Sequence, residues 1–218
     1  MISTPWRLLR TLAMALVVCE MGRCGESPEK NLVEDPGAEG KPQPQKIRGC
    51  LFPYGWGCYN GAGTAEWGIT QKEAHSGNNS VFMRITGFEE TVTNNALTFG
   101  GTTAGYNGER ALEAKPLTKY YFSFWIKGQG YFKPLRVFCQ GWNARLDASG
   151  RQRISTTLNS IKVSNKWERH EGTFMTAFDT VRFCIFIHAY GREALDVKKG
   201  ATIWVDDVYI KGGWKSES

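Results

Sequence analysis

Two segments decide the fold: Asn31-Leu-Val-Glu-Asp-Pro-Gly-Ala-Glu39-Gly40 near the start of the chain and Ile203-Trp-Val-Asp-Asp-Val-Tyr-Ile210 near its end. Between them lie short runs of β-branched and aromatic residues, separated by clusters of Gly, Asn, Asp and Ser. This composition is typical of strands joined by turns. We therefore predict that the two segments are the first and last strands of one all-β domain.

The expected strands lie at residues 31–35, 65–73, 80–86, 94–99, 119–127, 131–140, 153–162, 167–175, 181–190 and 202–211. No long helical period interrupts them. Many short strands with frequent turns favour a two-sheet antiparallel β-sandwich, arranged as a jelly roll, over an α/β fold.

Further motifs follow the first segment in a fixed order. They are His75-Ser-Gly77, Tyr120-Tyr-Phe-Ser-Phe-Trp-Ile-Lys-Gly128, Trp167-Glu-Arg-His-Glu-Gly-Thr-Phe174 and the Asp206-Asp207 pair. Together with Asn31–Gly40 they resemble jelly-roll carbohydrate-binding modules of the galactose-binding-like type, over about residues 30–212. Ala38 stands where that family has Phe, which removes some packing at the first strand. The resemblance implies binding of a polysaccharide or oligosaccharide without catalysis.

The resemblance also implies a structural calcium ion. Its carboxylate ligands would be Glu39 and Asp206, and backbone carbonyls near Gly37 and Asn78 would complete the site. Asp207 competes with Asp206, because adjacent strand residues face opposite sides. In the alternative without metal, the carboxylates only accept hydrogen bonds from turn amides and close the sandwich.

Strand alternation separates buried from outward-facing positions. Tyr120, Phe122, Phe124 and Ile126 form one face, and we take it as core. Two other strands place their apolar positions inward, namely Leu135 and Val137 in one and Val181, Phe183, Ile185 and Ile187 in the other.

The outward positions have the character of a sugar site, since sugar rings stack on aromatic side chains and bond to polar ones. The candidate platforms and rim aromatics are Trp125, Trp142, Tyr190, Tyr54, Trp56 and Tyr59. The candidate hydrogen-bonding residues are Arg136, Gln140, Asn143, Arg145 and His188.

Two other functions stay open. Arg136, Gln140, His188 and Tyr190 resemble the constellation of jelly-roll polysaccharide lyases, but the strand motifs of those enzymes are missing. A hydrolase would need two opposed carboxylates, and acidic residues are sparse on the proposed face. The third function is that of an adhesion or assembly domain whose partner is a protein.

The N-terminal segment predicts export. Residues 1–24 combine Arg7 and Arg10 with the apolar run Leu12–Val18, which is too short to span a bilayer, and read as a signal peptide. Residues 25–30 are expected to be a linker, 31–212 the sandwich and 213–218 a tail. We thus expect a secreted or periplasmic monomer. Cys19 and Cys24 leave a lipid anchor open, although neither follows a convincing lipobox.

The cysteines indicate which disulfides could form, and the net charge indicates which classes of ligand could bind. Cys50 with Cys58 is a plausible disulfide, whereas strand parity puts Cys139 and Cys184 on opposite faces and makes their pairing less secure. The net charge of +6 is compatible with an acidic ligand and equally with a solubilising surface. Without a block of Lys and Arg, nucleic acid is not an expected partner.

Overall fold

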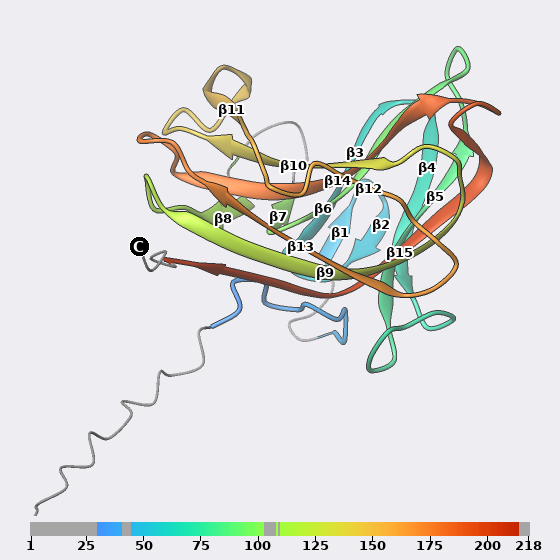
Figure 1. The fold of residues 1–218 in the computed structure, drawn as a ribbon, viewed down its shortest axis with the longest axis horizontal. Coiled ribbons are helices and arrows are strands. Elements are labelled where there is room, and N and C mark those ends of the chain that lie inside the picture. The colour runs from blue at the N-terminus through green and yellow to red at the C-terminus, as the bar shows by residue number, and fades with distance from the viewer. Residues whose placement is uncertain (1–29, 41–44, 103–107, 109, 214–218) are drawn as a thin grey trace, which may run out of the picture.

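Two antiparallel β-sheets packed face to face make up the computed structural model, which describes residues 30–40, 45–102, 108 and 110–213 (Figure 1). The expected signal peptide, nearly all of the linker and residues 214–218 of the tail lie outside these ranges. Within them, the only helix is the 3-10 turn η1 (Ala148–Gly150). None of the described residues forms a helix long and apolar enough to cross a membrane.

The larger sheet has eight strands. Its main path is β11 (Arg151–Ile154), β10 (Leu135–Trp142), β14 (Arg182–Arg192), β6 (Val92–Phe99) and β3 (Trp56–Ala62). Off this path lie β12 (Ser160–Ile161), β7 (Gly101–Thr102) and β8 (Arg110–Glu113).

The smaller sheet has five strands, in the order β13 (Glu168–Met175), β9 (Lys119–Tyr131), β15 (Val197–Gly212), β5 (Ser80–Gly87) and β4 (Thr64–Thr70). A separate hairpin joins β1 (Gln45–Ile47) to β2 (Cys50–Phe52). Its turn residues, Arg48 and Gly49, both have positive φ, as a tight two-residue hairpin turn requires. The all-β sandwich expected from the sequence is thus confirmed.

The core lies between the two sheets and follows the predicted alternation. Phe122, Phe124 and Ile126 of β9 face Phe183, Ile185 and Ile187 of β14 across it, and all six are buried. Because successive strand residues point to opposite faces, the other half of β14 projects from the outer side of the eight-stranded sheet. That outer side carries a second, smaller apolar cluster made of Ala96, Ala111, Trp142, Cys184 and Phe186.

The first predicted strand, residues 31–35, is wrong: this segment is irregular. It nevertheless lies along β15 (Figure 1), where the Leu32 amide donates to the Ile210 carbonyl at 2.9 Å. The Asn31 side chain replaces further ladder bonds. Its Nδ2 donates to the Val208 carbonyl at 2.8 Å and its Oδ1 accepts from the Ile210 amide at 3.0 Å. The two chain ends therefore meet as expected, through a side-chain amide.

The predicted disulfides are also corrected, since all four cysteines in the described residues are free. Cys139 belongs to the core between the sheets, whereas Cys184 belongs to the outer cluster. In the β10–β14 register Cys139 lies opposite Ile185, so the two thiols point to different faces, as parity indicated. Cys58 is buried in the core, and Cys50 only packs against its edge.

Candidate functional site

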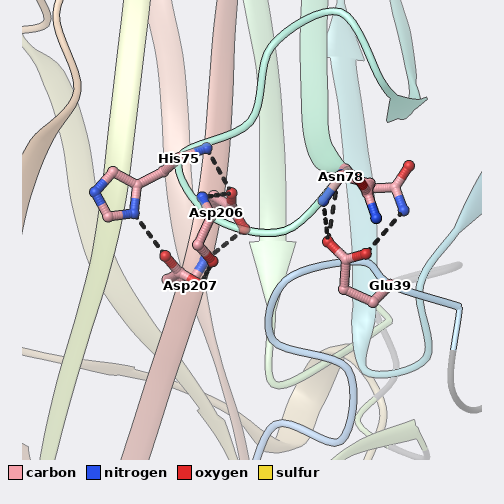
Figure 2. A network of polar contacts seen from close by, with 7 residues as sticks. Glu39, His75, Asn78, Asp206 and Asp207 are labelled. Carbon is pink, nitrogen blue, oxygen red and sulfur yellow. Dashed lines mark hydrogen bonds and ion pairs between the residues drawn. The ribbon is translucent and has the colours of Figure 1, made fainter.

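Glu39 and Asp206 tie the chain ends to the loop between β4 and β5 (Figure 2). The Glu39 carboxylate accepts hydrogen bonds from the backbone amides of Asn78 and Asn79, at 3.0 and 3.1 Å. Asp206 accepts from the amides of His75 and Ser76, at 2.8 and 3.1 Å. Both carboxylates thus hold one loop, and this is the arrangement expected of closure by turn amides.

Asp207 contacts the same loop as Asp206. Its φ of 46° lies at a β-bulge in β15, and its carboxylate bonds to His75 Nδ1 at 2.6 Å and to the Ser76 hydroxyl at 2.6 Å. The His75 ring stacks on Trp125, with ring centroids 3.7 Å apart and an interplanar angle of 15°. Trp125 is therefore partly covered by this loop.

The fit of this network to calcium is incomplete. An added Cβ at Gly37 would lie 3.4 Å from Asp206 Oδ1 and 3.8 Å from Asp207 Oδ1, so carboxylate oxygens do gather there. However, most hydrogen-bond donors to the Glu39 and Asp206 carboxylates are backbone amides, and the described residues include no group of three or more His, Cys, Asp or Glu side chains placed to hold a metal. Burial raises the pKa of Asp206, while the loop amides act to lower it. Calcium at Glu39 and Asp206 stays a prediction.

A groove opens on the outer face of the eight-stranded sheet, opposite the core. It encloses about 220 Å³. Its lining residues come from β3, β6, β10, β11 and β14 and are Tyr59, Asn94, Phe138, Gln140, Trp142, Arg151, Arg153, Phe186 and His188. Arg136 and Tyr190 continue the same face on β10 and β14, since Arg136 pairs with His188 in the strand register. We use "the groove" for these eleven residues.

Aromatic rings form the floor of the groove. Phe138 and Phe186 are stacked, with centroids 4.7 Å apart and an angle of 11°, and Tyr59 meets Phe186 edge-on at 6.3 Å. Tyr190 is the most open of the aromatic rings, at 47% exposed, with the Arg136 guanidinium 5.2 Å from its centroid. The Arg153 guanidinium lies 4.6 Å from the Phe138 centroid. Aromatic rings and guanidinium donors therefore lie in contact with one another in the groove.

His188 occupies the middle of the groove as a neutral group. Its Nε2 is hydrogen-bonded to Asn94 Oδ1, and its ring contacts Tyr59 edge-on. Burial, reinforced by the positive charges of Arg136 and Arg153, lowers the pKa of His188 to about 4. At neutral pH it can donate or accept hydrogen bonds without adding charge.

The structure brings together most of the predicted sugar-binding residues: Tyr59, Arg136, Gln140, Trp142, His188 and Tyr190. Gln140 is half-buried, and its Nε2 already donates to the carbonyls of Gly141 and Gln152. Trp142 is only 1% exposed, because Gly108 packs against its ring, so it forms a wall and not a platform.

Two predicted site residues lie elsewhere. Trp125 belongs to β9 of the five-stranded sheet. The outer face of that sheet lies on the opposite side of the molecule from the groove. Trp56 is fully buried between the sheets, and its Nε1 donates to the Asp35 carbonyl at 2.9 Å. It cannot share a rim with Tyr59, because residues three apart in a strand face opposite sides.

The remaining candidates lie beside the groove. Asn143 and Arg145 form the turn after β10, where the Arg145 amide donates to Asn143 Oδ1. Tyr54 lines a larger hollow of about 560 Å³ near Leu32 and Arg110. Among the described residues that line this hollow, Tyr54 is the single aromatic one, which makes the hollow a weaker candidate sugar site than the groove.

Several groove residues were not predicted as ligands: Asn94, Phe138, Arg151, Arg153 and Phe186. Phe138 and Phe186 have the parity of Gln140 and His188, and that parity was the available signal. Arg151 and Arg153 reach the groove because β11 pairs with the edge of β10, which places Arg153 opposite Gln140. Strand pairing of this kind is not encoded in a local pattern.

No protein-family model and no curated protein matches this chain. Among solved structures, the tandem CBM22-1–CBM22-2 domain of Xyn10C from Paenibacillus barcinonensis has a TM-score of 0.52 at 14% identity, over 87% of this chain and 47% of that chain. The CBM22-1 xylan-binding domain of the same protein gives 0.50 at 14% identity, over 86% and 97%. The family 11 carbohydrate-binding module of Lic26A-Cel5E from Clostridium thermocellum gives 0.47 at 16% identity, over 87% and 98%. At such identities the first two show the fold, which is the β-sandwich of carbohydrate-binding modules, as the sequence motifs predicted.

Proposed function

We propose that the protein binds a polysaccharide or oligosaccharide in the groove and performs no chemistry on it. The observation that carries this proposal is the row of rings on the outer face of the eight-stranded sheet, with Tyr190 open to solvent and guanidinium groups beside it. Flat ring faces stack on the C–H faces of sugars, and flanking donors orient their hydroxyl groups. The similar fold of a xylan-binding domain supports the same function.

The dimensions of the groove favour an extended ligand. Its volume of about 220 Å³ is below the roughly 300–1,000 Å³ of pockets that enclose a whole small molecule. Because Tyr190 and Arg136 extend the groove along β14 and β10 beyond this enclosed volume, a glycan chain would run past the volume and cover both residues. A chain bound in this way need not present its end.

Affinity electrophoresis against a panel of soluble polysaccharides tests the proposal. We expect retardation by at least one polymer, and Tyr190→Ala should weaken the affinity roughly fivefold, since one stacked ring contributes about 1 kcal/mol. Tyr209→Ala is the matched control, because Tyr209 is an aromatic residue on the outer face of the other sheet. Loss of binding in Tyr209→Ala alone would move the site to the five-stranded sheet.

A polysaccharide-cleaving enzyme is the second candidate, favoured by one observation. His188 and Tyr190 have ring centroids 6.1 Å apart and share their neighbourhood with Arg136, as an acid/base site would. Against it, the low pKa of His188 makes this residue a weak base, and the groove lining described here contains no Asp or Glu. Release of reducing ends or unsaturated products from a bound polymer would establish the enzyme. Binding to another surface protein, with no retardation by any glycan, would instead support an adhesion domain.

A further inference from the structure

Three arginines gather along the groove with no acidic residue among its described lining. Arg151 and Arg153 come from β11. Arg136 comes from β10 and pairs with His188 of β14 in the strand register. A concave surface lined by one sign of charge focuses its electrostatic potential on whatever enters. The groove therefore has a charge character as well as an aromatic one.

Two of these arginines differ from others on the molecule in what they contact. Arg84, Arg169 and Arg182 each pair with a carboxylate, at 3.4, 2.8 and 3.3 Å. Within the described residues Arg136 and Arg153 make no such ion pair, and instead lie over the rings of Tyr190 and Phe138. Their positive charge is therefore not neutralised by a neighbouring side chain from the described ranges.

His188 gives a second sign that these charges converge. Arg136 and Arg153, which lie on different strands, both act to lower its pKa, after the larger effect of burial. The two guanidinium groups thus act on the same central point of the groove. His188 itself is neutral there, so the arginines alone supply the local charge.

A guanidinium held over an aromatic ring matches a specific ligand geometry. A pyranose ring bound against Tyr190, the most exposed ring of the groove, would bring its ring substituents within reach of the Arg136 guanidinium, and the next residues of the chain would pass Arg153. Arginine binds a carboxylate or a sulfate through two parallel hydrogen bonds, which are stronger than those to a hydroxyl group. We infer that the groove selects anionic glycans, whose carboxylate or sulfate groups pair with Arg136 and Arg153. This inference rests on the proposed glycan-binding function and specifies its ligand class.

The experiment compares polymers that differ only in charge. Binding is measured by affinity electrophoresis and by titration calorimetry with polygalacturonate and alginate, and with the same polymers after reduction of their carboxyl groups. A sulfated galactan and its desulfated form make the second arm. We expect at least tenfold weaker binding to the neutralised member of whichever pair is recognised. The arm that responds separates a uronate ligand from a sulfated one.

Variants locate the effect in the groove. Arg136→Gln and Arg153→Gln should each weaken binding to the charged polymer at least fivefold more than they weaken binding to its neutral form. Arg84→Gln removes the same charge from the opposite sheet and should bind like the unmodified protein. Unchanged unfolding midpoints in all three variants would exclude a folding defect as the cause.

The outcomes separate this inference from the function on which it rests. Equal binding to the charged and neutral members of a pair would overturn the anionic selection and leave glycan binding in place. Absence of binding to every polymer would overturn both. Comparable binding to a single-stranded oligonucleotide, lost in the same two variants, would also overturn the inference, because a general anion site would then explain the arginines.

Discussion

The His188 side chain links the groove to the pH dependence of folding. Its pKa falls from 6.5 to about 4 in the folded protein. Between these values the unfolded chain binds a proton that the folded chain does not, so stability should rise with pH across this window and be complete above it. At 1.36 kcal/mol per unit, the cost at pH 4 would reach about 3 kcal/mol. Urea unfolding of the unmodified protein and of His188→Gln, from about pH 8 to about pH 4, measures this loss of stability.

The variant should lose this contribution to the pH dependence. His188→Gln keeps a polar partner for Asn94 but cannot titrate, so its stability should fall less than that of the unmodified protein as the pH is lowered. Taking the difference between the two proteins removes the contribution of other titrating groups, such as Asp206. A difference that stays constant across the pH range would show that His188 titrates alike in the folded and unfolded chains.

Thiol reactivity tests the correction made to the cysteines. Burial raises the pKa of Cys58 to about 11, and it also raises the pKa values of Cys139 and Cys184. Since the thiolate is the reactive form, these three should react with a disulfide reagent far more slowly in the folded protein than in denaturant. Cys50, which is only partly buried, should react first. A thiol count in denaturant that rises after prior reduction would restore the disulfide predicted from the sequence.

Strand parity predicts which side of a strand a residue faces, and it fails where the strand itself is not recognised. Phe122, Phe183 and Phe186 fall on their predicted sides because β9 and β14 are long and clearly alternating. The sequence pattern does not predict β3, because the glycines in this segment obscure its alternation, and for this reason Trp56 is predicted at the rim of the site. With that strand recognised, parity alone would have separated Trp56 from Tyr59.

At the scale of elements, the Asn31 side chain attaches the N-terminal segment to β15. Asn31→Ala removes the acceptor of the Ile210 amide and the donor to the Val208 carbonyl, in a region where both strand residues are buried. Leaving buried backbone groups without partners costs about 1–3 kcal/mol, so denaturant unfolding should show a loss of this size. Asn31→Asp keeps the acceptor and should lose less. Equal losses in the two variants would contradict a role for the Ile210 hydrogen bond.

The neighbours of each strand are what the sequence does not predict. Trp125 has outward parity like His188, yet β9 and β14 belong to different sheets, so the two residues lie on opposite sides of the molecule. Arg153 enters the groove only because β11 returns antiparallel to β10. Sheet membership depends on pairings between strands distant in sequence, whereas alternation is a local property. The sequence therefore predicts the chemical character of the groove, but it does not predict all the residues that line it.

At the scale of the whole molecule, closure of the sandwich depends on acidic residues from both chain ends. Glu39 and Asp206 reach the same loop, and Asp207 lies beside Asp206 (Figure 2). Burial raises the pKa of Asp206, and the negative charge of Asp207 adds a smaller contribution in the same direction. Hydrogen bonds from amides offset part of this repulsion. A bound cation would reduce this repulsion further. Calcium binding therefore remains to be tested, although amides make most of the observed contacts to these carboxylates.

Thermal unfolding with and without a chelator distinguishes the two forms of closure. If calcium is bound, EDTA should lower the Tm and excess calcium should restore it. A ligand at about a hundred times its Kd stabilises by about 2.7 kcal/mol, which corresponds to a shift of roughly 5–10 °C in a domain of this size. Glu39→Gln should then lower the Tm and abolish its response to calcium, whereas Glu66→Gln, an exposed carboxylate on β4, should keep that response. A Tm of the unmodified protein that neither EDTA nor calcium changes would mean that the loop amides alone close the sandwich, and Glu39→Gln should in that case still destabilise it through the weakened bonds to Asn78 and Asn79.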